Sequence, residues 1–158
     1  MGKYRIKTSP IAKKEAIIKG DKYRFTILTS RMVRIEYSEN GIFEDRATQI
    51  VYSRDFDVPE FTVTEKNGII EIKTEHIILT YHKDKKFTEH TLYAQFLGKN
   101  SMFHFNWHFG DYNVWNLNGT TKTIDGVDGE CKLEPGIMSH HNFSDIDDSK
   151  SLVFDKEG

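Results

Sequence analysis

The sequence has little of what disulfide-rich, metal-binding or membrane-spanning proteins require. Its 158 residues include one cysteine, Cys131, and three prolines. A lone cysteine excludes a disulfide framework and a thiolate metal site, and we interpret Cys131 as a packed side chain rather than a nucleophile. No apolar run approaches the roughly 20 residues of a membrane-spanning helix, and residues 1–10 lack the apolar segment of a signal peptide. We therefore expect a soluble, cytoplasmic protein with no membrane partner.

An excess of basic charge is also missing. Lysine and arginine total 22 against 24 aspartates and glutamates, which gives a net charge of -2. This balance offers no electrostatic surface for a nucleic acid, so no nucleic-acid partner is predicted. The nearest approach to a basic patch is Lys83, Lys85 and Lys86, interrupted by Asp84, and we interpret it as the solvated tip of a hairpin.

Aromatic and β-branched residues are plentiful, with 11 phenylalanines, 7 tyrosines and 2 tryptophans. Such side chains suit the pleated surface of a sheet. Apolar and polar residues alternate with the two-residue period of strands, which places Trp107 on an apolar core face. The strands are expected around residues 23–27, 33–37, 61–63, 70–72, 77–81, 92–96, 103–109 and 151–154.

Short strands joined by turns indicate an all-β fold, an antiparallel β-sandwich. Asn67-Gly68 between two alternating runs is a strong hairpin signal. Residues 11–19 are the longest stretch that could be helical. A long irregular loop is expected over 111–149, where Asn, Gly, Thr, Asp and Ser predominate. We expect residues 1–158 to form one domain of a longer chain, because the last strand ends close to Gly158.

Two polar groups raise the possibility of a metal ion. His104 and His108 would lie roughly 13 Å apart along a straight strand, which is too far for one zinc ion to bind both. Asp145, Asp147 and Asp148 lack the ligand spacing of a calcium loop, so a solvated turn is favoured. No metal site and no cofactor are predicted.

The irregular segment carries a family resemblance. It reads Asn-Leu-Asn-Gly-Thr-Thr-Lys-Thr-Ile-Asp from Asn116 to Asp125, and Leu-Glu-Pro-Gly-Ile-Met-Ser up to Ser139. With the Ile-Asp-Asp-Ser turn that ends at Ser149, this resembles a stretch in one subgroup of family 31 glycoside hydrolases. The chain departs from that subgroup at Lys122, where arginine is common, and at residues 139–142, where Ser-His-His-Asn replaces Ser-Arg-Asp-Gly.

The resemblance implies a galactose-mutarotase-like N-terminal domain that packs against a (β/α)8 barrel. The barrel of such α-glucosidase-like enzymes carries the aspartates of retaining hydrolysis. This chain has no Trp-x-Asp-Met nucleophile segment, so we expect it to be inactive alone and to brace the barrel of its own parent chain. The implied substrate is an α-linked glucoside or oligosaccharide, and a homo-oligomer is possible.

The resemblance also implies substrate-binding residues. Asp125 is the first candidate for contacting sugar hydroxyls, weighed equally against a role in building a turn. For Asp128 the turn is favoured, and Trp115 is an even choice between sugar stacking and packing. Both aspartates lie in a Gly-rich loop, so general-acid chemistry is not expected of either. Two rival functions stay open: a free-standing carbohydrate-binding β-sandwich without catalysis, and a structural domain used for oligomer contacts.

Overall fold

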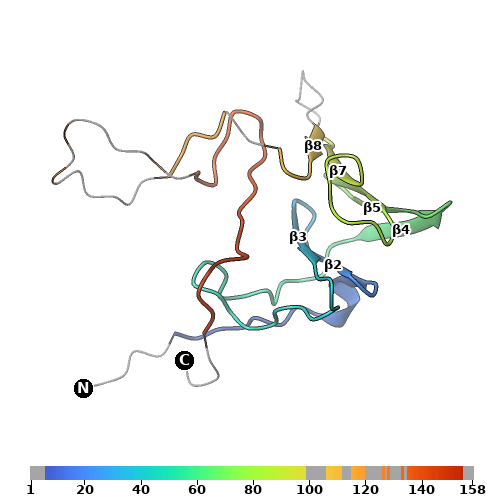
Figure 1. The fold of residues 1–158 in the computed structure, drawn as a ribbon, viewed down its shortest axis with the longest axis horizontal. Helices are drawn as coiled ribbons and strands as arrows, with labels where there is room; N and C mark the ends of the chain where they lie inside the picture. The colour runs from blue at the N-terminus through green and yellow to red at the C-terminus, as the bar shows by residue number, and fades with distance from the viewer. Residues whose placement is uncertain are drawn as a thin grey trace. The chain divides into compact units, whose positions relative to one another are not determined.

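A computed structural model of the chain describes residues 6–98, 106–111, 115–119, 126, 128, 133 and 135–154 (Figure 1). The chain divides into two compact units. One unit consists of Met1–Gly110 with Lys150–Gly158, and the other is Asp111–Ser149. All the described strands belong to the first unit. That residues 1–158 form one domain of a longer chain stays a prediction.

The first unit contains two antiparallel sheets, as the sequence predicts. The first sheet is formed by β1 (Ile17–Lys19), β2 (Tyr23–Thr29) and β3 (Met32–Tyr37), in that order. The second is formed in order by β4 (Phe61–Lys66), β5 (Ile69–Thr74), β6 (Ile77–His82), β7 (Leu92–Phe96) and β8 (Asn106–His108). Within each sheet, strands that are consecutive in sequence are antiparallel neighbours.

Strand alternation is clearest in β5. Ile70 and Ile72 are buried, whereas Glu71 and Lys73 between them are exposed. The connection from β4 to β5 is the two-residue turn Asn67-Gly68, with φ of 54° and 75°. Two positive φ values match the twist of an antiparallel pair, and glycine adopts them without strain. The predicted hairpin is confirmed.

Aromatic rings fill the space between the two sheets. Phe25 of β2 is 0% exposed, and its ring centroid lies 5.3 Å from that of Tyr81 on β6. Phe87 stacks on Phe25 at 5.9 Å, and Tyr23 lies 4.9 Å from Tyr81. Trp107 is 9% exposed, which confirms its predicted place in the core. These contacts join the two sheets, and the predicted all-β sandwich is confirmed.

A polar clasp joins the β2–β3 turn to the β5–β6 turn. The Thr74 hydroxyl donates to the Ser30 carbonyl at 2.7 Å. His76 places Nδ1 3.0 Å from Ser30 Oγ and Nε2 2.6 Å from Arg31 Nη2. Thr74 Oγ1 also accepts from the backbone N–H groups of His76 and Ile77. Since both turns meet here, the clasp fixes one end of the two sheets together.

One sequence expectation is wrong, and the stretch that could be helical contains a single 3-10 turn. Residues 11–19 do not form a helix; a short 3-10 turn, η1 (Lys14–Ala16), leads directly into β1. β-branched Ile17 and Ile18 pair with Thr26 and Phe25, and this pairing prevails over a weak local preference for helix. Residues 151–154 form one isolated bridge, Val153 to Thr48, rather than a strand. Phe103 and Phe105 of the predicted 103–109 strand lie outside the described residues.

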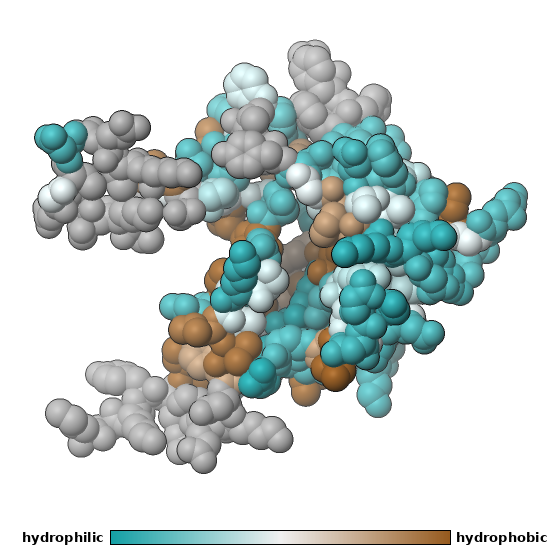
Figure 2. Space-filling model, in the orientation of Figure 1, coloured by the Kyte–Doolittle hydropathy of each residue, from teal (hydrophilic) through white to brown (hydrophobic). Residues whose placement is uncertain are grey.

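An apolar patch lies on the first unit, where the last described residues meet the segment before β4. Leu152 is 74% exposed, Ile50 50% and Tyr52 42%. The Gln49 N–H donates to the Leu152 carbonyl at 2.8 Å, and the Tyr52 and Phe154 rings lie 5.7 Å apart. Brown atoms gather at the lower left in Figure 2. Within the part of the chain that the structure describes, no helix has the length and apolar character to span a bilayer.

Buried Tyr81 should make the free energy of unfolding depend on pH in the alkaline range. Its side chain is buried and its hydroxyl donates to the Lys85 carbonyl at 2.6 Å. Burial raises the pKa of Tyr81 from 10.0 to about 12. The folded state therefore retains this proton after the unfolded state has lost it, so the free energy of unfolding should fall as pH rises from 10 toward 12.

Denaturant midpoints across this interval, with phenolate absorbance, measure the effect. The variant Tyr81→Phe should show a shallower fall. The remainder is due to Tyr23, whose pKa is raised by burial, and to Lys13, Lys22 and Lys83, whose pKa values are raised by hydrogen bonds to carboxylates. An identical pH profile in the variant would contradict the assignment to Tyr81.

Candidate functional site

The second unit is organised around the side chain of Asn116. Its amide Nδ2 donates to the Gly136 carbonyl at 2.8 Å and to Ser144 Oγ at 3.2 Å. Its Oδ1 accepts from the backbone N–H of Gly136 at 2.8 Å and from that of Asn118 at 2.8 Å. One side chain thereby satisfies both backbone groups of a residue 20 positions away. Asn116 thus acts as a clamp at the base of the predicted loop.

Backbone pairing reinforces this clamp. Asn116 and Ser139 form an antiparallel bridge. The Leu117 N–H donates to the Met138 carbonyl at 2.9 Å, and the His140 N–H donates to the Trp115 carbonyl at 3.1 Å. The two ends of the 116–139 segment therefore lie side by side. We call the residues that the bridge and the clamp join the base of this loop.

Gly136 permits the close approach that the clamp needs. A Cβ built on Gly136 would lie 2.7 Å from the Asn118 carbonyl carbon and 2.8 Å from the Gly119 nitrogen. Real side chains do not tolerate such contacts with backbone atoms, so only glycine fits here. Asn118 has a φ of 60°, a left-handed conformation that asparagine adopts more readily than most residues.

Aromatic side chains lie beside the loop base. Trp115 is 56% exposed. Its ring lies 5.9 Å from that of His141 and 6.4 Å, edge to face, from that of His140. His141 in turn stacks on Phe143 at 6.1 Å. These contacts restrain an indole that still presents more than half of its surface to solvent.

The structure describes two of the three predicted site residues, Trp115 and Asp128. Trp115 adjoins the loop base. Asp128 is exposed at a bend, and no hydrogen bond or ion pair to it occurs in the described part of the chain. Asp125 lies outside the described residues. Asp147 accepts the Ser149 N–H at 3.0 Å, which confirms a turn where calcium was considered.

Removing the clamp should loosen the loop base. In the variant Asn116→Ala, the amides of Leu117 and His140 should exchange with solvent about tenfold faster, because hydrogen bonds worth about 1 to 1.5 kcal/mol in total restrain local opening. Hydrogen exchange followed by NMR measures this. Ser144→Ala is the matched control: it loses one hydroxyl of the same cluster and should change exchange less. Equal effects of the two variants would show that Asn116 is not the main restraint.

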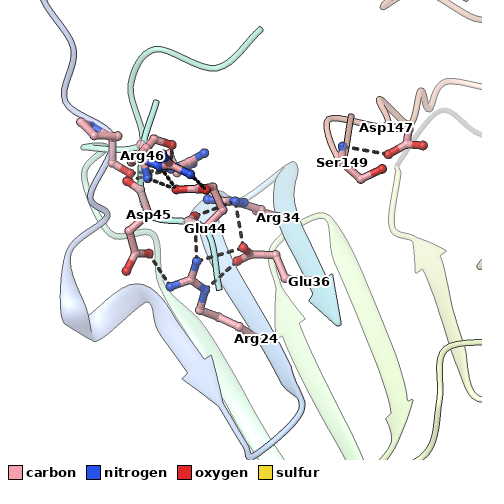
Figure 3. A network of polar contacts seen from close by, with 10 residues as sticks. Arg24, Arg34, Glu36, Glu44, Asp45, Arg46, Asp147 and Ser149 are labelled. Carbon is pink, nitrogen blue, oxygen red and sulfur yellow. Dashed lines mark hydrogen bonds and ion pairs between the residues drawn. The ribbon is translucent and has the colours of Figure 1, made fainter. Parts of the chain in front are cut away.

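The first unit contains a second polar cluster, centred on Arg24 of β2 (Figure 3). Nε and Nη2 of Arg24 donate to the two Glu36 carboxylate oxygens at 2.6 and 2.9 Å. Nη1 donates to Asp45 at 2.6 Å, and Nη2 also donates to the Glu44 carbonyl at 3.1 Å. The Arg24 side chain is only 9% exposed, so the cluster is a substantially desolvated ion-pair network.

Neighbouring groups complete the network. Arg34 pairs with Glu36 at 2.8 Å. Arg46 donates to both carboxylate oxygens of Glu44, and this hydrogen bonding lowers the pKa of Glu44 from 4.5 to about 2. The Phe43 ring lies 5.0 Å from both the Lys19 ammonium and the Arg24 guanidinium. The three acidic residues are all paired with arginines, which suits a structural tie and not proton transfer.

The alternation of apolar and polar residues does not by itself predict this cluster. A two-residue alternation over 23–27 would put Arg24 and Thr26 on a polar face, whereas six consecutive residues of β2 are buried. The register was the available signal. A turn centred on Ser30 places Arg24 opposite Glu36, and the structure shows this pairing.

The described residues bring no group of three or more His, Cys, Asp or Glu together in a metal-binding arrangement. The groups at the loop base can instead interact with a ligand through hydrogen bonds and aromatic contacts. A scan against models of protein families finds none that matches this chain, and a search of curated proteins finds no match either.

Proposed function

We propose that this chain is the non-catalytic N-terminal β-sandwich of a retaining α-glucosidase-like glycoside hydrolase of family 31. Its role is to brace the catalytic barrel of the parent chain and to contribute the 116–139 loop to the substrate pocket. The ligand is an α-linked glucoside or short oligosaccharide. Catalytic aspartates belong to the barrel and not to this chain.

The observation that carries the proposal is the built base of the loop. A segment that only connects two strands has no need of a clamp such as Asn116, with its four hydrogen bonds. Holding a loop in one conformation before the ligand binds lowers the entropic cost of binding. The clamp therefore supports a segment whose far end has to be positioned against a ligand.

The rim of the base supports a sugar ligand. Trp115 presents an exposed ring, and pyranose rings pack an apolar face against aromatic rings. Hydrogen-bonding groups at His140 and His141 lie beside that ring. Such a combination of one aromatic face and nearby polar atoms is typical of small-molecule sites.

The apolar patch of Ile50, Tyr52 and Leu152 supports the bracing role. Exposed apolar side chains gathered on one face of a small domain are typical of surfaces that pack against another domain or chain. In a parent enzyme such a patch would be covered, and in the isolated chain it favours self-association.

The coding sequence that follows Gly158 provides the first test. A barrel-sized region with two suitably placed aspartates, one of them in a Trp-x-Asp-Met segment, supports the enzyme. A stop codon there would instead support the free-standing carbohydrate-binding module.

Sugar binding by the chain provides the second test. Titration with maltose should change tryptophan fluorescence, since Trp115 is exposed whereas Trp107 is buried. The change should vanish in Trp115→Ala and persist in Tyr52→Ala, a matched loss of an exposed ring from the other unit. No response in the unmodified chain would remove the loop base from the sugar site.

Kinetics of the parent enzyme test Asp125. The variant Asp125→Ala should lower kcat/KM on aryl α-glucosides about tenfold or more, which corresponds to one lost charge-assisted hydrogen bond. Asp128→Ala, the weaker candidate, should have a smaller effect. Unchanged kinetics in Asp125→Ala would exclude that residue from the pocket.

A further inference from the structure

Asn-Gly pairs are chemically labile, and this chain has three of them: Asn40-Gly41, Asn67-Gly68 and Asn118-Gly119. The backbone nitrogen of the glycine can attack the side-chain carbonyl carbon of the preceding asparagine, because no Cβ shields that nitrogen. Ammonia leaves and a five-membered succinimide forms. Water then opens the ring to aspartate or isoaspartate. The local sequence is the same at all three sites, so the fold decides which one reacts.

The first pair is held on both reacting atoms. Asn40 Oδ1 accepts from the Ser38 hydroxyl at 2.7 Å and from the Ile42 N–H at 3.1 Å. The Gly41 N–H, which carries the attacking nitrogen, donates to the Ser38 carbonyl at 3.2 Å. A Cβ on Gly41 would lie 2.6 Å from the Asp21 carbonyl oxygen, so this backbone is also packed against its neighbour.

The third pair is held by the base of the loop. The Asn118 N–H donates to the clamp oxygen of Asn116. The peptide between Asn118 and Gly119 lies directly against Gly136, where a Cβ would come within 2.8 Å of the Gly119 nitrogen. Rotating this peptide toward the cyclisation geometry would break the clamp.

The second pair is held differently: the Gly68 carbonyl accepts from the Lys83 N–H at 2.8 Å, but that carbonyl takes no part in the cyclisation. Asn67 and Gly68 are both exposed, and within the described residues no hydrogen bond engages the Asn67 side chain or the Gly68 amide. Apart from its chain neighbours, no heavy atom lies within 4 Å of a Cβ built on Gly68, so this face of the turn is open. The turn also adjoins β4, an edge strand of the sheet with five of its six residues exposed. Local opening of the hairpin at this turn should therefore require little free energy.

We propose that Asn67-Gly68 is a site of spontaneous deamidation and isoaspartate formation in the folded protein. The net reaction consumes one water, releases ammonia and replaces a neutral amide by a carboxylate. Isoaspartate adds one methylene to the main chain. In a two-residue turn this lengthening disturbs the register that pairs Lys66 with Ile69.

The test is to incubate the folded chain in mildly alkaline buffer and to map peptides by mass spectrometry after cleavage at lysine and arginine. Deamidation adds about one dalton, and chromatography separates the aspartate and isoaspartate products. Conversion at Asn67 should be at least about tenfold faster than at Asn40 or Asn118, which corresponds to a difference of about 1.4 kcal/mol in local opening. In denaturant the three rates should converge.

Two variants sharpen the test. Asn67→Asp should remove the fast conversion, whereas the matched variant Asn40→Asp should leave it unchanged. Faster conversion at Asn40 or Asn118 than at Asn67 in the folded chain would overturn the proposal. So would equal rates at all three sites before denaturant is added.

Discussion

The variant Arg24→Ala should lose about 3 kcal/mol of unfolding free energy, because it removes the centre of a desolvated ion-pair network and leaves Glu36 with one fewer partner. Arg24 makes four hydrogen bonds that tie β2 to β3 and to Glu44 and Asp45. Glu36 is 13% exposed, so water replaces the lost guanidinium poorly. Arg34 still pairs with Glu36, which limits the loss. Denaturant unfolding followed by circular dichroism measures it.

Controls separate burial from charge in this prediction. Lys13→Ala removes a cation from the exposed Lys13–Asp57 pair and should leave the denaturation midpoint unchanged. Arg24→Lys retains the charge but not the two-pronged contact with Glu36, so an intermediate loss is expected. If Arg24→Ala and Lys13→Ala shift the midpoint equally, the network around Arg24 does not stabilise the fold.

The variant Phe25→Ala should cost about 4 kcal/mol, the largest stability effect that we expect from one substitution in this chain. Phe25 is fully buried, and its ring lies within 6 Å of the rings of Tyr23, Tyr81 and Phe87. Tyr23 and Tyr81 come from different sheets and Phe87 from the connection between β6 and β7, so the cavity would open where the two sheets meet. The loss should appear as a lower midpoint of thermal or denaturant unfolding.

Phe25→Leu keeps a measurable folded state should the alanine variant fail to fold, and should cost about 1.5 kcal/mol or less. Val63→Ala is the matched surface control, because Val63 is 45% exposed on the edge strand β4. Its effect should stay within about 0.5 kcal/mol. A comparable loss in Val63→Ala and Phe25→Ala would mean that the ring cluster does not form the core.

Much of the sandwich could be predicted because its strands have strong local signals. Alternation over 70–73 and the Asn-Gly turn before it specify a hairpin without help from the rest of the chain. Residues 11–19 and 151–154 lack such signals: the first stretch was left open to helix, and the strand predicted over the second was wrong. Pairing with β2 made a strand of Ile17–Lys19, whereas Val153 found only a single bridge partner in Thr48.

The sequence could predict which segment contains the candidate site, but not the contacts that its residues make. The resemblance pointed to residues 116–139, and the structure shows a clamp at their base. Nothing in the local sequence indicated that Asn116 would reach Gly136 or Ser144. Those contacts join residues 20 and 28 positions apart, and such contacts depend on how the whole segment folds back.

The sequence by itself determined the all-β class, the β4–β5 hairpin and the apolar face of Trp107, because period-two alternation and turn residues act within a few positions of the chain. Only the tertiary structure decided that Arg24 is buried among carboxylates, that Asn116 clamps a loop, and that Asn67-Gly68 has no hydrogen bond to its reacting groups within the described residues. Each of these depends on which distant atoms lie within hydrogen-bonding distance. Local residue preferences carry no information about such distances.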